Sequence, residues 1–143
     1  MTAINPYLNF DSNTEEAFEF YKSVFGGEFA TVMRFKEAPP CPEMGELSTE
    51  DGEKIMHIAL PIGNGNVLMA TDALESMGQK MTTGNNFSIS ISTESREETE
   101  KIFNGLSAGG KITMPLAETF WSAYFGMCKD KFGVQWMVNY DRK

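Results

Sequence analysis

Two stretches of the chain decide its fold: NTEEAFEFYKSVFGGEF, residues 13–29, and SREETEKIFNGLSAGGKI, residues 95–112. In the first, apolar residues recur at i, i+3, i+4, i+7 and i+8, which is the period of one helical face: Ala17, Phe20, Tyr21, Val24 and Phe25. Asn13, followed three residues later by a glutamate, suits an N-terminal cap. The pair Gly26-Gly27 then ends the helix. This stretch therefore predicts an amphipathic helix.

The second stretch repeats the cap and the apolar stripe, with every position displaced by 82 residues. Ser95 and Glu98 form the cap, and the stripe contains Thr99, Ile102, Phe103 and Leu106. Any two capped amphipathic helices could share these features, so the helices alone do not establish a duplication. The strands around them provide the further evidence.

Each predicted helix is preceded by one short strand and followed by three. Apolar and polar residues alternate there with the period of a half-buried strand. The predicted strands are residues 4–10, 28–35, 54–62 and 66–72 in the first half, and 86–92, 110–115, 119–127 and 134–140 in the second. The sequence thus predicts an α+β fold of two tandem β-α-β-β-β modules, residues 1–75 and 85–143, in a single domain. The proline-rich stretch at residues 36–51 is interpreted as a loop or flap.

A single helix covers only one face of a module's sheet. Pairing two modules would curve the sheets around a cleft between the uncovered faces. A duplicated module would therefore form a cleft that a single module lacks. We expect this cleft to be the functional surface.

Composition narrows the possible partners. The net charge of −8 argues against nucleic acid, which requires clustered Lys and Arg. No run of about 18 apolar residues could span a bilayer, and residues 1–10 lack the features of a signal peptide, so a soluble cytoplasmic protein without a membrane partner is expected. The two cysteines, Cys41 and Cys128, form no CxxC motif and are interpreted as reduced thiols.

The segments PYLNF, FYKSVFGGE, MHIALPIGNGNVLMATD and TFWSAYFGMCKDKFGVQW occur in an order that resembles the vicinal oxygen chelate superfamily. This superfamily includes glyoxalase I, ring-cleaving dioxygenases, and fosfomycin- and bleomycin-resistance proteins. The chain is most similar to the PhnB-like branch, whose members often carry names involving 3-demethylubiquinone methyltransferase. It departs from that branch at Lys131, where Pro is common, and at Val134, where a His often follows the glycine.

The resemblance implies a divalent metal held by one side chain from the first and last strand of each half. Strand alternation puts Asn5, Met69, Asn86 and Met137 at these places. Amides and thioethers are poor ligands for Zn²⁺, Fe²⁺, Ni²⁺ or Mn²⁺, so no metal site of the usual kind and no cofactor is expected. A divalent metal bound in another manner stays open. The same four side chains are candidates for binding a ligand in the cleft, where a thioether suits an apolar molecule; the alternative for Met69 and Met137 is that they fill core space.

Four further side chains are candidates for the cleft. His57, the only histidine, falls on the cleft face of its strand and is a candidate general base or hydrogen-bond donor; the alternative is a structural histidine. Tyr7, Trp121 and Tyr124 are candidates for an aromatic wall, with a core position as the alternative for Trp121. Trp136 is predicted to face the helix.

Two functions fit these features. The first is a homodimeric protein that binds a small apolar or cationic molecule in its cleft without metal. The second is an enzyme of the glyoxalase or dioxygenase type that acts on a small oxygenated substrate.

Overall fold

A computed structural model describes residues 3–38, 47–63, 65–121 and 123–141. The chain divides into two compact units, Met1–Thr82 and Thr83–Lys143. We describe each unit by itself, and the cleft between them stays a prediction. Within the described residues, none of the helices is long and apolar enough to cross a membrane.

The first unit contains β1 (Tyr7–Phe10), α1 (Thr14–Phe25), β2 (Thr31–Arg34), β3 (Ile55–Pro61) and β4 (Val67–Asp72). The described residues of this unit also form the short helices η1 (Phe35–Glu37), α2 (Thr49–Glu53) and η3 (Glu75–Met77). The strands form one sheet in the order β1-β4-β3-β2, in which β1 runs parallel to β4 and the other neighbours are antiparallel.

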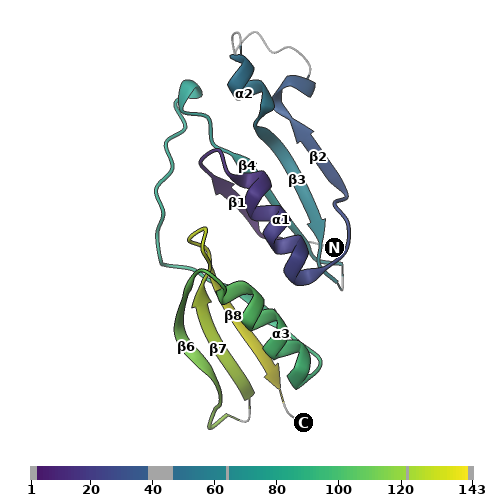
Figure 1. The fold of residues 1–143 in the computed structure, drawn as a ribbon, viewed down its shortest axis with the longest axis vertical. Helices are drawn as coiled ribbons and strands as arrows, with labels where there is room; N and C mark the ends of the chain where they lie inside the picture. The colour runs from purple at the N-terminus through teal and green to yellow at the C-terminus, as the bar shows by residue number, and fades with distance from the viewer. Residues whose placement is uncertain (1–2, 39–46, 64, 122, 142–143) are drawn as a thin grey trace. The chain divides into compact units, whose positions relative to one another are not determined.

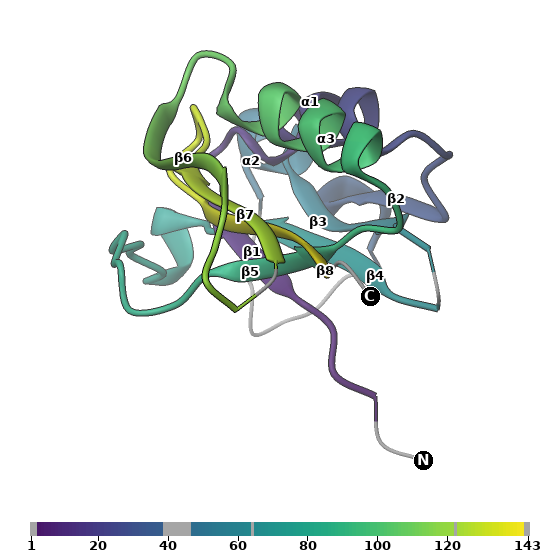
Figure 2. The same cartoon turned by 90° about the horizontal axis from the view of Figure 1, so that it is seen from below.

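The second unit repeats this order with β5 (Ile89–Ser92), α3 (Arg96–Ser107), β6 (Lys111–Glu118), β7 (Ala123–Lys129) and β8 (Gln135–Asp141). Its sheet has the order β5-β8-β7-β6, again with one parallel pair, β5 and β8. In Figures 1 and 2 each unit, taken by itself, has its long helix on one face of its sheet. The predicted pair of β-α-β-β-β modules in an α+β fold is confirmed.

The helix-facing side of the first sheet carries the alternate apolar residues of its strands. All are buried: Leu8, Phe10, Ile58, Leu60, Leu68 and Ala70. The buried stripe of α1, however, is Thr14, Ala17, Phe18 and Tyr21, while Phe20, Val24 and Phe25 are only half-buried. The prediction put Phe20 on the stripe and missed Phe18, whose ring contacts Phe10 edge-on at 6.5 Å. Both phenylalanines fit a helical period, and contact with the sheet selects between them.

A buried carboxylate fastens α1 to the sheet. Asp72, at the end of β4, is 2% exposed. Its Oδ1 accepts hydrogen bonds from the Thr14 backbone N–H at 3.1 Å and the Thr14 hydroxyl at 2.7 Å. Its Oδ2 accepts from the Ile55 N–H at 2.8 Å. Asp72 therefore takes over the capping role predicted for Asn13, whose side chain makes no capping bond.

The core of the second unit follows the sequence more closely. The whole predicted stripe of α3 is buried: Thr99, Ile102, Phe103 and Leu106. Ser95 caps the helix by accepting from the Glu98 N–H at 3.1 Å, as predicted. A Cβ on Gly126 of β7 would come within 2.7 Å of the Phe103 ring, so the glycine lets the helix lie close to the strand.

The ends of the elements correct several predictions. β1 and β5 begin later than expected, so Asn5, Asn86 and Phe87 precede the strands, and Phe87 is 61% exposed. β7 begins at residue 123 instead of 119. The predicted loop at residues 36–51 has short helices at both ends, and residues 39–46, including Cys41, lie outside the described residues.

The substitution Asp72→Asn should lower the free energy of unfolding by roughly 2–3 kcal/mol. An amide turns N–H groups toward the donors of Thr14 or Ile55, and the charge-assisted bonds are lost. Urea unfolding measures the effect, with the exposed Asp11→Asn as the control. Equal stability of Asp72→Asn and the control would contradict the capping role.

Candidate functional site

The far face of the first sheet, the face opposite α1, carries a row of paired residues across its strands. Tyr7 is the strand partner of Met69, Met69 of Ala59, and Ala59 of Thr31. His57 lies on the same face of β3, opposite Met33 of β2. The alternation therefore puts Tyr7, His57 and Met69 on the far face, as the sequence predicts. Their role toward a ligand stays a prediction.

Tyr7 and His57 interact directly. The Tyr7 hydroxyl lies 3.1 Å from His57 Nδ1, and the two rings are stacked with centroids 5.7 Å apart and planes inclined by 25°. Tyr7 is 46% exposed and His57 is half-buried, so both side chains are accessible from solvent. Partial burial raises the pKa of the Tyr7 hydroxyl above its ordinary value, and the phenol stays protonated at neutral pH. The pair therefore presents hydrogen-bonding groups at the surface, with the His57 ring held in place by the Tyr7 hydroxyl.

Asn5 has a structural contact. Its side-chain oxygen accepts a hydrogen bond from the Val67 backbone N–H at 3.0 Å, which fastens the segment before β1 to the start of β4. The oxygen predicted to reach a ligand is therefore already engaged with the backbone.

The far face of the second sheet carries a row of methionines. Ser90 of β5 is the partner of Met137, Met137 of Met127, and Met127 of Met114. Met127 and Met137 are half-buried and Met114 is 45% exposed. Three thioethers thus adjoin one another across β8, β7 and β6, and the sequence analysis identified only Met137 among them. The register of β6 shifts twice, before and after Met114, and this irregular register is what brings Met114 into the row.

Two other predicted site residues precede their strands. Asn86 is exposed and lies before β5. Trp121 lies before β7, is 51% exposed, and contacts Phe125 edge-on with centroids 5.9 Å apart. The core alternative for Trp121 is therefore wrong, and its ring is available at the surface.

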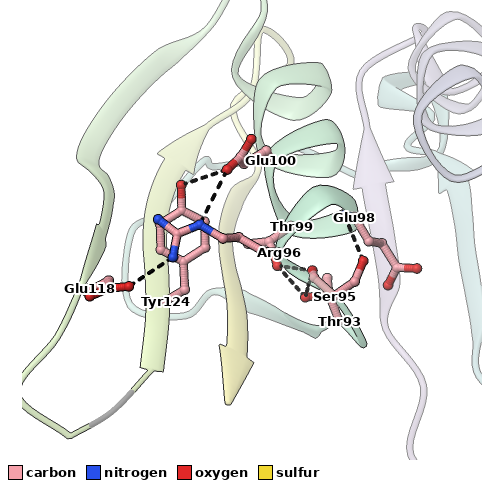
Figure 3. A network of polar contacts seen from close by, with 8 residues as sticks. All are labelled: Thr93, Ser95, Arg96, Glu98, Thr99, Glu100, Glu118 and Tyr124. Carbon is pink, nitrogen blue, oxygen red and sulfur yellow. Dashed lines mark hydrogen bonds and ion pairs between the residues drawn. The ribbon is translucent and has the colours of Figure 1, made fainter. Parts of the chain in front are cut away.

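Tyr124 lies on the helix-facing side, which corrects its predicted place in the far-face wall. Figure 3 shows its ring beneath Arg96 at the start of α3. The guanidinium carbon is 4.2 Å from the ring centroid, and the Tyr124 hydroxyl donates to Glu100 at 3.3 Å. Arg96 also binds Glu118 of β6 at 2.8 Å. This network clamps α3 to β6 and β7.

The reason for the Tyr124 error is the spacing of the two residues along the strand. The sequence pattern suggested a strand at residues 119–127 that presents Trp121 and Tyr124 together. Residues three apart in a strand point to opposite faces, so the two could share a wall only through an irregularity. Burial raises the pKa of Tyr124, and the neighbouring Glu100 carboxylate adds to the effect. Tyr124 is therefore a packing residue.

Trp136 faces the helix as predicted and is fully buried. Its indole N–H donates to Asp130 Oδ2 at 2.8 Å. Asp130 Oδ1 accepts from the backbone N–H groups of Phe132 and Val134, at 2.8 and 3.0 Å. The positions of Asp72 and Asp130 beside loops predict cap or turn roles, and these bonds confirm them.

The far-face residues can be compared with the ligands that a divalent metal requires. On the first and last strands of the two units they supply amides, hydroxyls and thioethers, among them Tyr7, Asn9, Met69, Ser90 and Met137. Zn²⁺, Fe²⁺, Ni²⁺ and Mn²⁺ are bound in proteins by imidazole and carboxylate, so this set does not fit them. Among the residues that the structure describes, no three His, Cys, Asp or Glu side chains gather into a group that could hold a metal ion.

Two four-stranded sheets of this order, each with one long helix, define a protein of the glyoxalase/bleomycin-resistance fold. A glyoxalase/bleomycin resistance protein/dioxygenase family enzyme from Burkholderia phytofirmans has the same fold, with a TM-score of 0.62 over 98% of this chain and 100% of that one at 17% identity. The chain belongs to the family described as 3-demethylubiquinone-9 3-methyltransferase, which matches residues 2–139.

Three other proteins are similar along nearly the whole chain. Protein YjdN of Escherichia coli is 33% identical over 140 residues, which are 95% of this chain and 93% of YjdN. The crystal structure of protein PA1353 from Pseudomonas aeruginosa is 38% identical, with a TM-score of 0.86 and complete coverage of both chains. A PhnB protein from Bacillus cereus, titled a putative 3-demethylubiquinone-9 3-methyltransferase, is 28% identical with a TM-score of 0.74 and covers 97% and 99% of the two chains.

Cys128 allows a test of the helix-facing core. The thiol is 1% exposed, and burial, reinforced by the Asp130 carboxylate, raises its pKa to about 11. An unfolded thiol has a pKa of about 8.5, so rising pH should favour the unfolded chain from there up to about 11. In a Cys41→Ser variant at pH 8, iodoacetamide should label Cys128 far more slowly in the folded protein than in urea. Labelling at equal rates would contradict the described packing.

Proposed function

We propose that the chain binds a small apolar or cationic molecule on the far faces of its sheets, without the divalent metal that is usual in the superfamily. The observation that carries the proposal is the composition of these faces. One presents Met69 beside the Tyr7–His57 pair, and the other presents the row of Met114, Met127 and Met137. Methyl transfer, which the description of the family names, is not part of this proposal.

Thioether side chains suit such a ligand. Methionine is unbranched and polarizable, so it adapts its shape to a bound molecule and makes favourable contacts with aromatic rings. A cation would also find attractive aromatic faces, of which Trp121 and Tyr7 are accessible. The net charge of −8 gives a weak general preference for cations over anions.

A second candidate function is metal-independent catalysis on a small oxygenated substrate. The observation in its favour is the hydrogen bond between Tyr7 and His57, because an imidazole supported by a hydroxyl is a common proton-transfer group. In this function His57 would accept or donate the proton and Tyr7 would orient its ring. A turnover assay with His57→Ala distinguishes this function from binding alone.

The binding proposal predicts that substitution of a far-face methionine lowers the affinity for a ligand, whereas substitution of a methionine elsewhere does not. For a compound found by screening aromatic and ammonium molecules, Met69→Ser or Met137→Ser should weaken binding by about tenfold for each ~1.4 kcal/mol by which the substitution reduces the binding free energy. Calorimetric titration measures the affinity. The matched control is Met77→Ser, because Met77 is 39% exposed and lies outside both sheets. Equal losses in the control and in the far-face variants would contradict the proposal.

The absence of the usual metal is a separate prediction. Protein purified without chelator should carry well under one equivalent of Zn²⁺, Ni²⁺, Mn²⁺ or Fe²⁺ by elemental analysis, because the donors at Asn5, Met69, Asn86 and Met137 suit none of them. Adding these ions should leave the melting temperature unchanged. One equivalent of bound metal, or a rise in melting temperature at stoichiometric metal, would refute this part of the proposal.

We also propose that the chain forms a homodimer. β1, β2, β5 and β6 lie at the ends of the strand orders, and an uncovered edge strand favours pairing with another chain. The edge strand β6 exposes two apolar residues, Ile112 and Met114, to 48% and 45%. Multi-angle light scattering should give twice the chain mass at tens of micromolar protein, and a single-chain mass would contradict the dimer.

A further inference from the structure

The hydrogen bond between Tyr7 and His57 bears on the chemistry of a ligand. It decides whether the free nitrogen of the His57 ring donates or accepts a hydrogen bond. A neutral imidazole has one nitrogen that donates and one that accepts, and a partner on one nitrogen decides the role of the other. Tyr7 contacts Nδ1. The role of Nε2 therefore follows from the direction of this one bond.

The chemistry of the two groups favours donation from the phenol. Its hydroxyl is protonated at neutral pH, and imidazole nitrogen is a much stronger base than phenol oxygen. The Tyr7 hydroxyl therefore donates the hydrogen bond and His57 Nδ1 accepts it. The proton of the neutral imidazole then resides on Nε2. Within the described part of the chain, no protein hydrogen bond to His57 Nε2 accompanies the one to Nδ1. Nε2–H is left as a donor at a partly accessible position.

We infer that Tyr7 is a positioning residue that holds neutral His57 in the Nε2–H tautomer, and that the ligand is an apolar molecule with an uncharged carbonyl oxygen. This inference rests on the proposed function and narrows it. The donor excludes a cation from its immediate neighbourhood. Among the described residues, the neighbouring side chains of this face, Met69, Ala59, Met33 and Thr71, bring no positive charge to neutralise a carboxylate. An uncharged oxygen acceptor on an apolar body satisfies both conditions.

The first experiment measures the tautomer and needs no ligand. The chain has one histidine, so a long-range ¹H–¹⁵N spectrum of labelled protein shows a single imidazole. At about pH 9, where imidazole is ordinarily neutral, Nε2 should give the shift of a protonated nitrogen and Nδ1 that of an acceptor. Tyr7→Phe should move the two resonances toward each other, whereas the matched control Tyr140→Phe should not. A protonated Nδ1, or identical spectra for the native protein and Tyr7→Phe, would overturn the inference.

The second experiment compares acetophenone, ethylbenzene and benzyltrimethylammonium as probes. Acetophenone should shift the Nε2 resonance and bind about tenfold more tightly than ethylbenzene, which corresponds to about 1.4 kcal/mol. Tyr7→Phe should reduce that ratio. Binding of the ammonium ion beside His57 in preference to the ketone would overturn the carbonyl assignment and leave the proposed function standing. If none of the probes shifts a far-face residue, the proposed function and the carbonyl assignment both fail, while the tautomer result stands separately.

Discussion

One long helix lies against each four-stranded sheet, and side chains alternate between the two faces of a strand. The helix can bury only one of these faces, so each unit has a helix-facing side filled by packing and a far face that packing against the helix does not determine. The residues of the core and those of the candidate site divide between these two faces. The helix-facing side contains Trp136, Phe103 and the residues around Asp72, whereas the far face contains the thioethers, Tyr7 and His57.

Polar groups hold the helix-facing sides together. In the first unit the buried Asp72 carboxylate binds the start of α1 and the start of β3 at once. In the second, Arg96 bridges α3 to Tyr124 and Glu118, and Asp130 orders the turn before β8 while binding Trp136. These contacts fix the position of each helix without any far-face residue. The far face can therefore vary in chemistry while the fold is retained, which agrees with the varied activities named for proteins of this fold.

Much of the fold could be predicted from the sequence because it depends on local periodicity. The stripe of α3, the cap at Ser95 and the strand alternation around His57 each occupy a few consecutive residues. Other features depend on contacts between distant residues. Phe18 replaces Phe20 on the stripe of α1 because Phe10 lies beneath it, and Asn13 loses the cap to Asp72, 59 residues further along the chain. No pattern within α1 could reveal either.

The candidate site shows the same division. Alternation alone correctly put Tyr7, His57 and Met69 on one face, but it could not show that Tyr7 and His57 share a hydrogen bond across β4. The predicted wall of Trp121 and Tyr124 goes against the same alternation, because residues three apart in a strand point to opposite faces. The sequence analysis missed Met114 and Met127, because Met127 joins the row through the pairing of β7 with β8, and Met114 through the irregular register of β6. Register and strand ends are properties of the sheet as a whole.

The central claim is that ligands bind on the far faces, and methionine-methyl NMR tests it most directly. Ten methionines distribute probes along the chain, including Met33 and Met69 on one far face and Met114, Met127 and Met137 on the other. Titration of [methyl-¹³C]methionine-labelled protein with acetophenone should shift far-face methyl resonances and leave those of the exposed Met77 and Met81 unchanged. Shifts confined to Met77 and Met81, with the far-face methyl groups unaffected, would contradict the account.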